Sequence, residues 1–111
     1  MSSQIEKFEQ MLSAGQDSAL LRFALGSAYL QQSEADRAAV HLNKAVTLNP
    51  DYSAAWKLLG KAHTKQNNPD EARLAYQNGI AVAEKNGDMQ AAREMRVFLK
   101  RLGNKPDHQP R

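Results

Sequence analysis

The sequence contains no cysteine, and glycine, proline and aromatic residues are scarce. Its 111 residues include 6 Gly and 4 Pro, and 6% are aromatic. The lack of cysteine excludes disulfides and thiolate zinc sites. No apolar run reaches the length of a membrane span, and residues 1–8 lack the apolar core of a signal peptide. We therefore expect no membrane partner and a cytoplasmic location.

Positive charge is modest and is concentrated at one end of the chain. The net charge is +3. Residues 1–84 carry 8 Lys and Arg against 9 acids, a net of −1, whereas residues 85–111 carry 7 against 3, a net of +4. No aromatic residue alternates with these charges to stack on bases, so the pattern disfavours nucleic acid as a partner.

One segment of the sequence occurs twice, at an offset of 34 residues. This offset aligns Arg22 with Trp56, Leu25 with Leu59, Gly26 with Gly60, Tyr29 with His63, Ala38 with Ala72 and Leu42 with Tyr76. The second copy reads Trp56-x2-Leu59-Gly60-x2-His63, then Ala72-x3-Tyr76. This period and spacing resemble the tetratricopeptide repeat. The resemblance implies an all-α fold, a solenoid of antiparallel helix hairpins with about six helices.

Two glycines stand at matching positions inside the helical patterns. Gly in a helix costs about 1 kcal/mol relative to Ala, so Gly26 and Gly60 need a compensating role. Helices that pack at about 8–10 Å need small residues where they cross. We expect Gly26 to face Ala38 and Gly60 to face Ala72 at two such crossings.

The periodicity and the helix stop signals predict a single domain over residues 1–102. Its expected parts are a half-repeat helix over 3–14, a first repeat over 19–52, a second repeat over 53–86 and a capping helix over 88–102. Residues 103–111 are expected to form a disordered tail.

Local signals also predict where helices begin. Asp17 or Ser18 can cap the helix that follows them. Ser33 and Asp36 read as a variant of the capping box that opens the next helix.

The sequence shows no catalytic or cofactor-binding pattern. None of the three histidines, His41, His63 and His108, has a second metal ligand four residues on or a nucleophile as a partner. We expect His41 on a helix surface and His63 in a packing position, where the first copy has Tyr29. The protein is therefore expected to be no enzyme and to need no metal or cofactor.

The resemblance implies a concave groove, lined by the first helix of each repeat, that binds a peptide or a partner helix. Carried over by position, the groove residues of the first copy are Leu20, Phe23, Ser27, Leu30 and Gln31. Those of the second copy are Ala54, Lys57, Lys61, Thr64 and Lys65. The expected groove is thus half apolar and half basic, and an acidic peptide is one candidate partner.

Lys57, Lys61 and Lys65 share one helix face because they are spaced four residues apart. No acid is interleaved on that face, so the three ammonium groups repel one another unless an anion binds. Two interpretations remain open: a site for an acidic peptide or a terminal carboxylate, and a solvated face that keeps the protein soluble.

A second basic patch is predicted on the last helix. It consists of Arg93, Arg96, Lys100 and Arg101. Positive charge near a helix C-terminus is favourable on dipole grounds alone; an acidic partner or a nucleic acid backbone is the alternative. A self-associating scaffold, formed through Phe98 and Leu99 as a weak homo-oligomer, is a further alternative to peptide binding.

Overall fold

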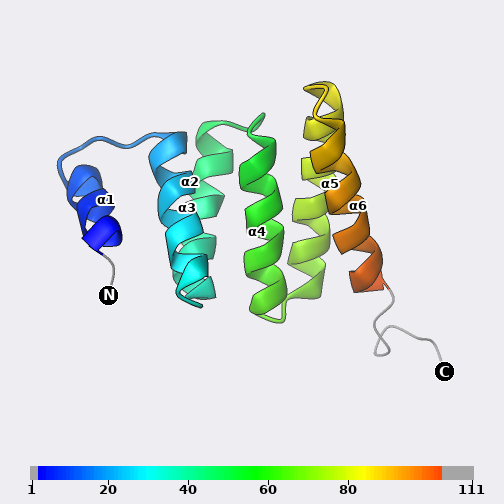
Figure 1. The fold of residues 1–111 in the computed structure, drawn as a ribbon, viewed down its shortest axis with the longest axis horizontal. Helices are drawn as coiled ribbons and strands as arrows, with labels where there is room; N and C mark the ends of the chain where they lie inside the picture. Colours follow the sequence, from blue (N-terminus) through cyan, green and yellow to red (C-terminus); the bar gives the residue numbers. More distant parts are fainter. Residues whose placement is uncertain (1–2, 104–111) are drawn as a thin grey trace.

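The computed structural model describes residues 3–103, which fold into six α-helices with no strand among them. The helices are α1 (Ser3–Ser13), α2 (Ala19–Gln31), α3 (Ala35–Leu48), α4 (Ser53–Lys65), α5 (Pro69–Lys85) and α6 (Met89–Gly103). Figure 1 shows them side by side in a row that follows the order of the chain. The predicted all-α fold of stacked helix hairpins is confirmed. The predicted tail lies outside the described residues except for Gly103, which ends α6.

Side chains cap the starts of two helices. The Ser18 Oγ atom accepts the Leu21 N–H of α2 at 3.1 Å, and the Asp88 Oδ1 atom accepts the Ala91 N–H of α6 at 3.3 Å. Each cap satisfies an amide that has no partner within its helix. Of the two caps predicted for α2, Ser18 is therefore the one used, and Asp17 pairs with Arg22 instead.

Three turns between helices share one backbone design. Ser33, Asn67 and Gly87 have left-handed φ angles of 62°, 64° and 79°. The following amide donates to the carbonyl five residues earlier, in the pairs Glu34 to Tyr29, Asn68 to His63 and Asp88 to Ala83. These bonds are typical of a helix C-terminus. The predicted capping box is wrong, because Ser33 belongs to the end of α2 and Glu34 occupies the N-cap position of α3.

The glycines at the helix crossings make room for large side chains. A Cβ atom on Gly26 would overlap the Leu42 side chain, and one on Gly60 would overlap the Tyr76 ring. The predicted pairing of these glycines with Ala38 and Ala72 is therefore wrong. The partner lies one helical turn further on, because the seam is filled by one large residue against glycine rather than by two small residues.

A third glycine has the same role but has no counterpart in the first repeat. A Cβ atom on Gly79 in α5 would lie 2.9 Å from Cβ of Trp56 and 2.5 Å from Sδ of Met95. Gly79 thus lets α4 and α6 approach α5 together. The offset of 34 residues aligns it with Ala45, so the repeat pattern gave no signal for it.

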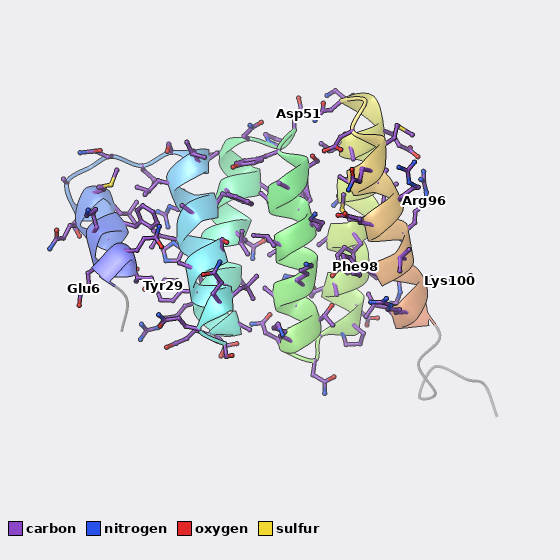
Figure 2. The ribbon with its side chains drawn as sticks, viewed as in Figure 1. Glu6, Tyr29, Asp51, Arg96, Phe98 and Lys100 are labelled. Carbon is purple, nitrogen blue, oxygen red and sulfur yellow. The ribbon has the colours of Figure 1, made fainter. Side chains whose placement is uncertain are left out.

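Two groups of buried side chains form the core. The first lies among α2, α3 and α4, where Leu25 and Leu42 are fully buried. The second lies between α5 and α6 and includes Tyr76, Met95 and Leu102. Figure 2 shows Phe98 on the α5 side of α6, with Arg96 and Lys100 toward the outer edge of the row. The last helix therefore covers α5 and presents its charged side outward.

Candidate functional site

The predicted groove residues of the first copy gather beside α1. A cavity of about 280 Å³, here called the N-terminal cavity, lies between α1 and α2. Its lining includes Gln4 and Phe8 from α1 and, from α2, Leu20, Phe23, Ala24, Ser27, Ala28 and Gln31. Leu30 is not among them and packs half-buried against the core. Carrying over repeat positions could not find Gln4 and Phe8, since these come from the half repeat.

Three of the predicted residues of the second copy line a cavity beside α6. This C-terminal cavity has a volume of about 360 Å³ and lies between α4, α5 and α6. Its lining is Lys61, Thr64, Lys65, Tyr76, Phe98, Arg101 and Leu102. Arg101 was predicted as part of the separate basic patch, and the fold brings it to the groove lysines.

The Phe98 ring is the centre of the C-terminal cavity. The Lys61 Nζ atom lies 5.1 Å from the ring centroid and the Arg101 Cζ atom 5.7 Å from it. On the core side, the centroids of the Phe98 and Tyr76 rings are 5.6 Å apart. Cations at these distances are attracted by the electron-rich face of the ring. The two cations are thereby held near one another at the cavity.

Lys57 does not belong to an unpaired lysine face. Its Nζ atom lies 2.8 Å from Oε1 of Glu94 on α6, and both residues line a smaller cavity of about 190 Å³. The hydrogen bond from Lys57, followed by its charge, lowers the pKa of the Glu94 carboxyl. The interpretation that this face lacks an acid is therefore wrong for Lys57. Ala54, also predicted for the groove, is half-buried on α4 and lines none of these three cavities.

The four residues of the predicted basic patch are divided among different surroundings. Arg96 pairs with Glu84 of α5, and Arg101 lines the C-terminal cavity. Arg93 and Lys100 are exposed and, within residues 3–103, have no ion-pair partner. Only part of the predicted patch is thus available as free positive charge.

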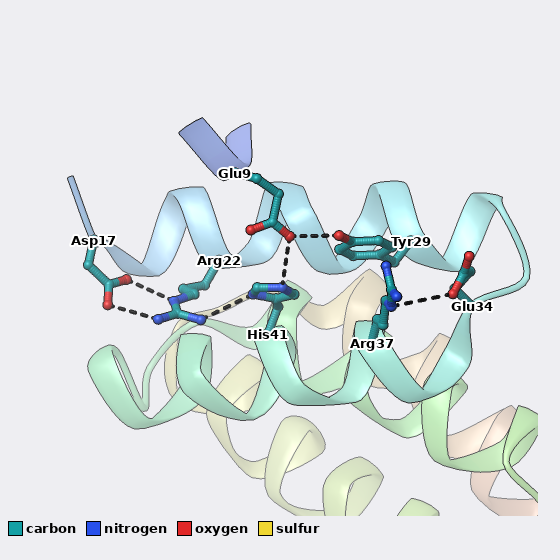
Figure 3. Close-up of polar contacts among 7 residues, drawn as sticks. All are labelled: Glu9, Asp17, Arg22, Tyr29, Glu34, Arg37 and His41. Atoms are coloured by element: carbon teal, nitrogen blue, oxygen red, sulfur yellow. Dashed lines mark hydrogen bonds and ion pairs between the residues drawn. The ribbon is translucent and has the colours of Figure 1, made fainter. Parts of the chain in front are cut away.

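A polar cluster holds α1 against α2 and α3 (Figure 3). The Tyr29 hydroxyl donates to the Glu9 carboxylate at 2.6 Å, and His41 Nε2 lies 3.6 Å from the same oxygen. Arg22 donates to His41 Nδ1 at 3.1 Å and pairs with Asp17. A guanidinium can only donate, so Nδ1 accepts and the proton of neutral His41 sits on Nε2, toward Glu9.

His41 is therefore a buried anchor and not a surface residue, which corrects the sequence-based expectation. Only 9% of the residue is exposed, and its ring stacks on Tyr29 with the centroids 5.5 Å apart. Burial is the main reason that the pKa of His41 is lowered; the Arg22 charge adds to this and the Glu9 charge opposes it. No sequence signal gave this burial, because the second copy has Ala75 at the equivalent position.

Comparison with known proteins decides the family. The sequence model of the family described as Tetratricopeptide repeat matches residues 5–53 and, in an overlapping second match, residues 23–88. This chain is a tetratricopeptide repeat protein. The matches end before α6 begins at Met89, so α6 lies outside the part that the family model describes.

Relatives of this tetratricopeptide repeat protein include small proteins of similar length. TPR repeat-containing protein PA0015 of Pseudomonas aeruginosa is 51% identical over 98 residues, which are 88% of this chain and 93% of the relative. The solution structure of protein BPP2914 from Bordetella parapertussis has a TM-score of 0.79 at 43% identity, over 93% of this chain and 90% of that one.

A third relative is a tetratricopeptide repeat domain protein from Salinibacter ruber. Its solution structure has a TM-score of 0.75 at 26% identity, over 86% of this chain and 97% of that one. Members of this family are generally non-catalytic modules that bind other proteins. Within residues 3–103, no three His, Asp or Glu side chains are grouped to hold a metal ion, and no helix is long and apolar enough to cross a membrane.

Proposed function

We propose that this tetratricopeptide repeat protein is a non-catalytic adaptor that binds a segment of a partner protein along α2, α4 and α6. The observation that carries the proposal is the position of the two larger cavities. One lies beside α2 and the other beside α4, and predicted groove residues line both. A peptide or partner helix that crosses this face would meet an apolar cavity first and a basic cavity second.

The N-terminal cavity suits an apolar side chain. Leu20 is 68% exposed at its edge, and the Phe23 ring lies 4.9 Å from the Tyr52 ring, which fixes its position. An exposed leucine beside a fixed aromatic ring is the kind of surface that gains most from being covered. We expect the partner to bury Leu20.

The experiment is an affinity pull-down from native cell extract with matched variants. Leu20→Glu tests the N-terminal cavity, and the double variant Lys61→Ala with Lys65→Ala tests the C-terminal one. The control is Lys44→Ala with Lys100→Ala, which removes equal charge from exposed positions outside both cavities. Circular dichroism first establishes that all variants are folded.

We expect a protein that is retained by wild type and by the control but lost from at least one cavity variant. Equal retention by every variant would place the binding surface elsewhere, and retention of no specific protein by wild type would contradict the adaptor function. The cytoplasmic location expected from the sequence is part of this proposal, and fractionation of the native cells tests it.

A further inference from the structure

The C-terminal cavity collects positive charge that has no counter-charge. Lys61, Lys65 and Arg101 line it, and no Asp or Glu is among its lining residues. Within residues 3–103, none of these three cations has an ion-pair partner.

Most other cations of the described chain are neutralised locally. The paired ones are Arg22 with Asp17, Arg37 with Glu34, Lys57 with Glu94, Arg73 with Asp70, Lys85 with Asp51 and Arg96 with Glu84. The unpaired Lys7, Lys44, Arg93 and Lys100 do not line the C-terminal cavity. Three unpaired cations at one hollow repel one another, and a bound anion would relieve that repulsion.

The base of the same cavity is apolar. Tyr76 is only 2% exposed and Leu102 only 3%, so both present a small, fixed patch of carbon at the cavity surface. Phe98 adds its ring beside them. The Thr64 hydroxyl is already committed, since it donates to the Gly60 carbonyl at 2.8 Å. A ligand therefore meets carbon at the base and cations around it.

We propose that the C-terminal cavity binds an acidic peptide segment in which one apolar side chain is flanked by carboxylates. This inference rests on the proposed adaptor function and assigns the ligand chemistry of one part of it. The apolar side chain would cover Phe98 and Leu102, while the carboxylates pair with Lys61, Lys65 and Arg101. Arg101 has the particular value of a planar donor pair that matches a carboxylate.

The shape of the cavity favours a peptide side chain over a free inorganic anion. Its volume of about 360 Å³ is at the small end of ligand pockets, which hold a few hundred Å³ or more. A bare phosphate would use the cations but would leave the Phe98 and Leu102 surface uncovered. Both features of the cavity are used only by a ligand that carries a carboxylate next to an apolar group.

The test is an NMR titration of the full chain with synthetic peptides. The probe is a short acetylated and amidated peptide in which one leucine is flanked by glutamates; one companion has glutamine for glutamate and another has serine for leucine. Inorganic phosphate is titrated separately. We expect the probe to shift the signals of Lys61, Lys65, Phe98 and Arg101, with an affinity that falls as salt increases.

Both companion peptides should bind more weakly than the probe. Removal of a single cation by Lys65→Ala or Arg101→Ala should raise Kd about fivefold, and Arg101→Lys should recover only part of the loss. Lys100→Ala is the control, because Lys100 is an exposed, unpaired neighbour on α6 that does not line the cavity; it should leave Kd unchanged.

Several results would overturn the assignment. They are shifts that fall outside the cavity, equal binding of the serine companion, phosphate binding as tight as that of the probe, and an unchanged Kd in Arg101→Ala. A native partner retained equally by wild type and by Lys65→Ala with Arg101→Ala would reject the cavity but keep the adaptor function. If wild type retains no native protein, the adaptor function itself fails.

Discussion

The Lys57 ammonium donates to the Glu94 carboxylate at 2.8 Å and so connects α4 to α6. The pair lies at one end of α4, and Lys61 and Lys65 follow toward the other end, beside the C-terminal cavity. Of three lysines with the same spacing on one face, one therefore stabilises the fold and two remain available to a ligand.

The Lys57–Glu94 pair should contribute a small, salt-dependent part of the stability. Glu94→Gln removes the charge but keeps the size of the side chain, and we expect a slight decrease in melting temperature at low salt that disappears at high salt. A double-mutant cycle with Lys57→Met measures the coupling. A decrease that is equally large at high salt would show that Glu94 acts through packing.

The close approach of α4 and α5 should make Gly60 intolerant of any side chain. Gly60→Ala gains about 1 kcal/mol of helix propensity but must displace the buried Tyr76 ring, and overpacking costs about 1–3 kcal/mol. We expect a net loss of about 1 kcal/mol in the free energy of unfolding, measured with urea. Gly103→Ala is the control, because a Cβ atom there meets nothing within 4 Å. Equal effects of the two substitutions would contradict the packing role of Gly60.

The sequence predicted the helices well because the repeat fixes their spacing. α4 begins 34 residues after α2, at Ser53 against Ala19, as the offset of the two copies requires. The offset then fails. α5 has 17 residues where α3 has 14, and α6 begins at Met89, 36 residues after Ser53.

This change of spacing explains what the sequence could not predict about the candidate site. Which α6 side chains face α4 cannot be carried over from the repeat, so neither the Glu94 partner of Lys57 nor the position of Arg101 beside Lys61 was foreseen. The pairing of Gly26 with Leu42 depends on how two helices interdigitate, and periodicity gives only the face on which a residue lies.

α6 should stabilise the domain mainly through Met95. This side chain is fully buried against α5, where it contacts the Gly79 region. Met95→Ala should lower the free energy of unfolding by about 2–5 kcal/mol, measured by chemical denaturation. Val97→Ala on the same helix is the control, since Val97 is 48% exposed and should have an effect below about 0.5 kcal/mol. Similar losses for both would argue against α6 as a tightly packed cap.

Stability should fall as the pH drops through the range in which His41 titrates. The pKa of His41 is lowered in the folded state from its ordinary value of 6.5, chiefly by burial. The unfolded chain therefore binds a proton at a higher pH than the folded chain does. As the pH falls below about 6.5, protonation favours the unfolded state, and this effect levels off below the folded pKa.

The measurement is the free energy of unfolding on both sides of that pH, above the range in which carboxylates titrate. His41→Asn keeps an acceptor near the Arg22 guanidinium but cannot titrate, so its unfolding free energy should change less with pH than that of the wild type. His63→Asn is the matched control and should keep the wild-type dependence, because His63 lies outside the Glu9 cluster. If His41→Asn shows the full wild-type dependence, another group is responsible and the buried imidazole is not the source of acid sensitivity.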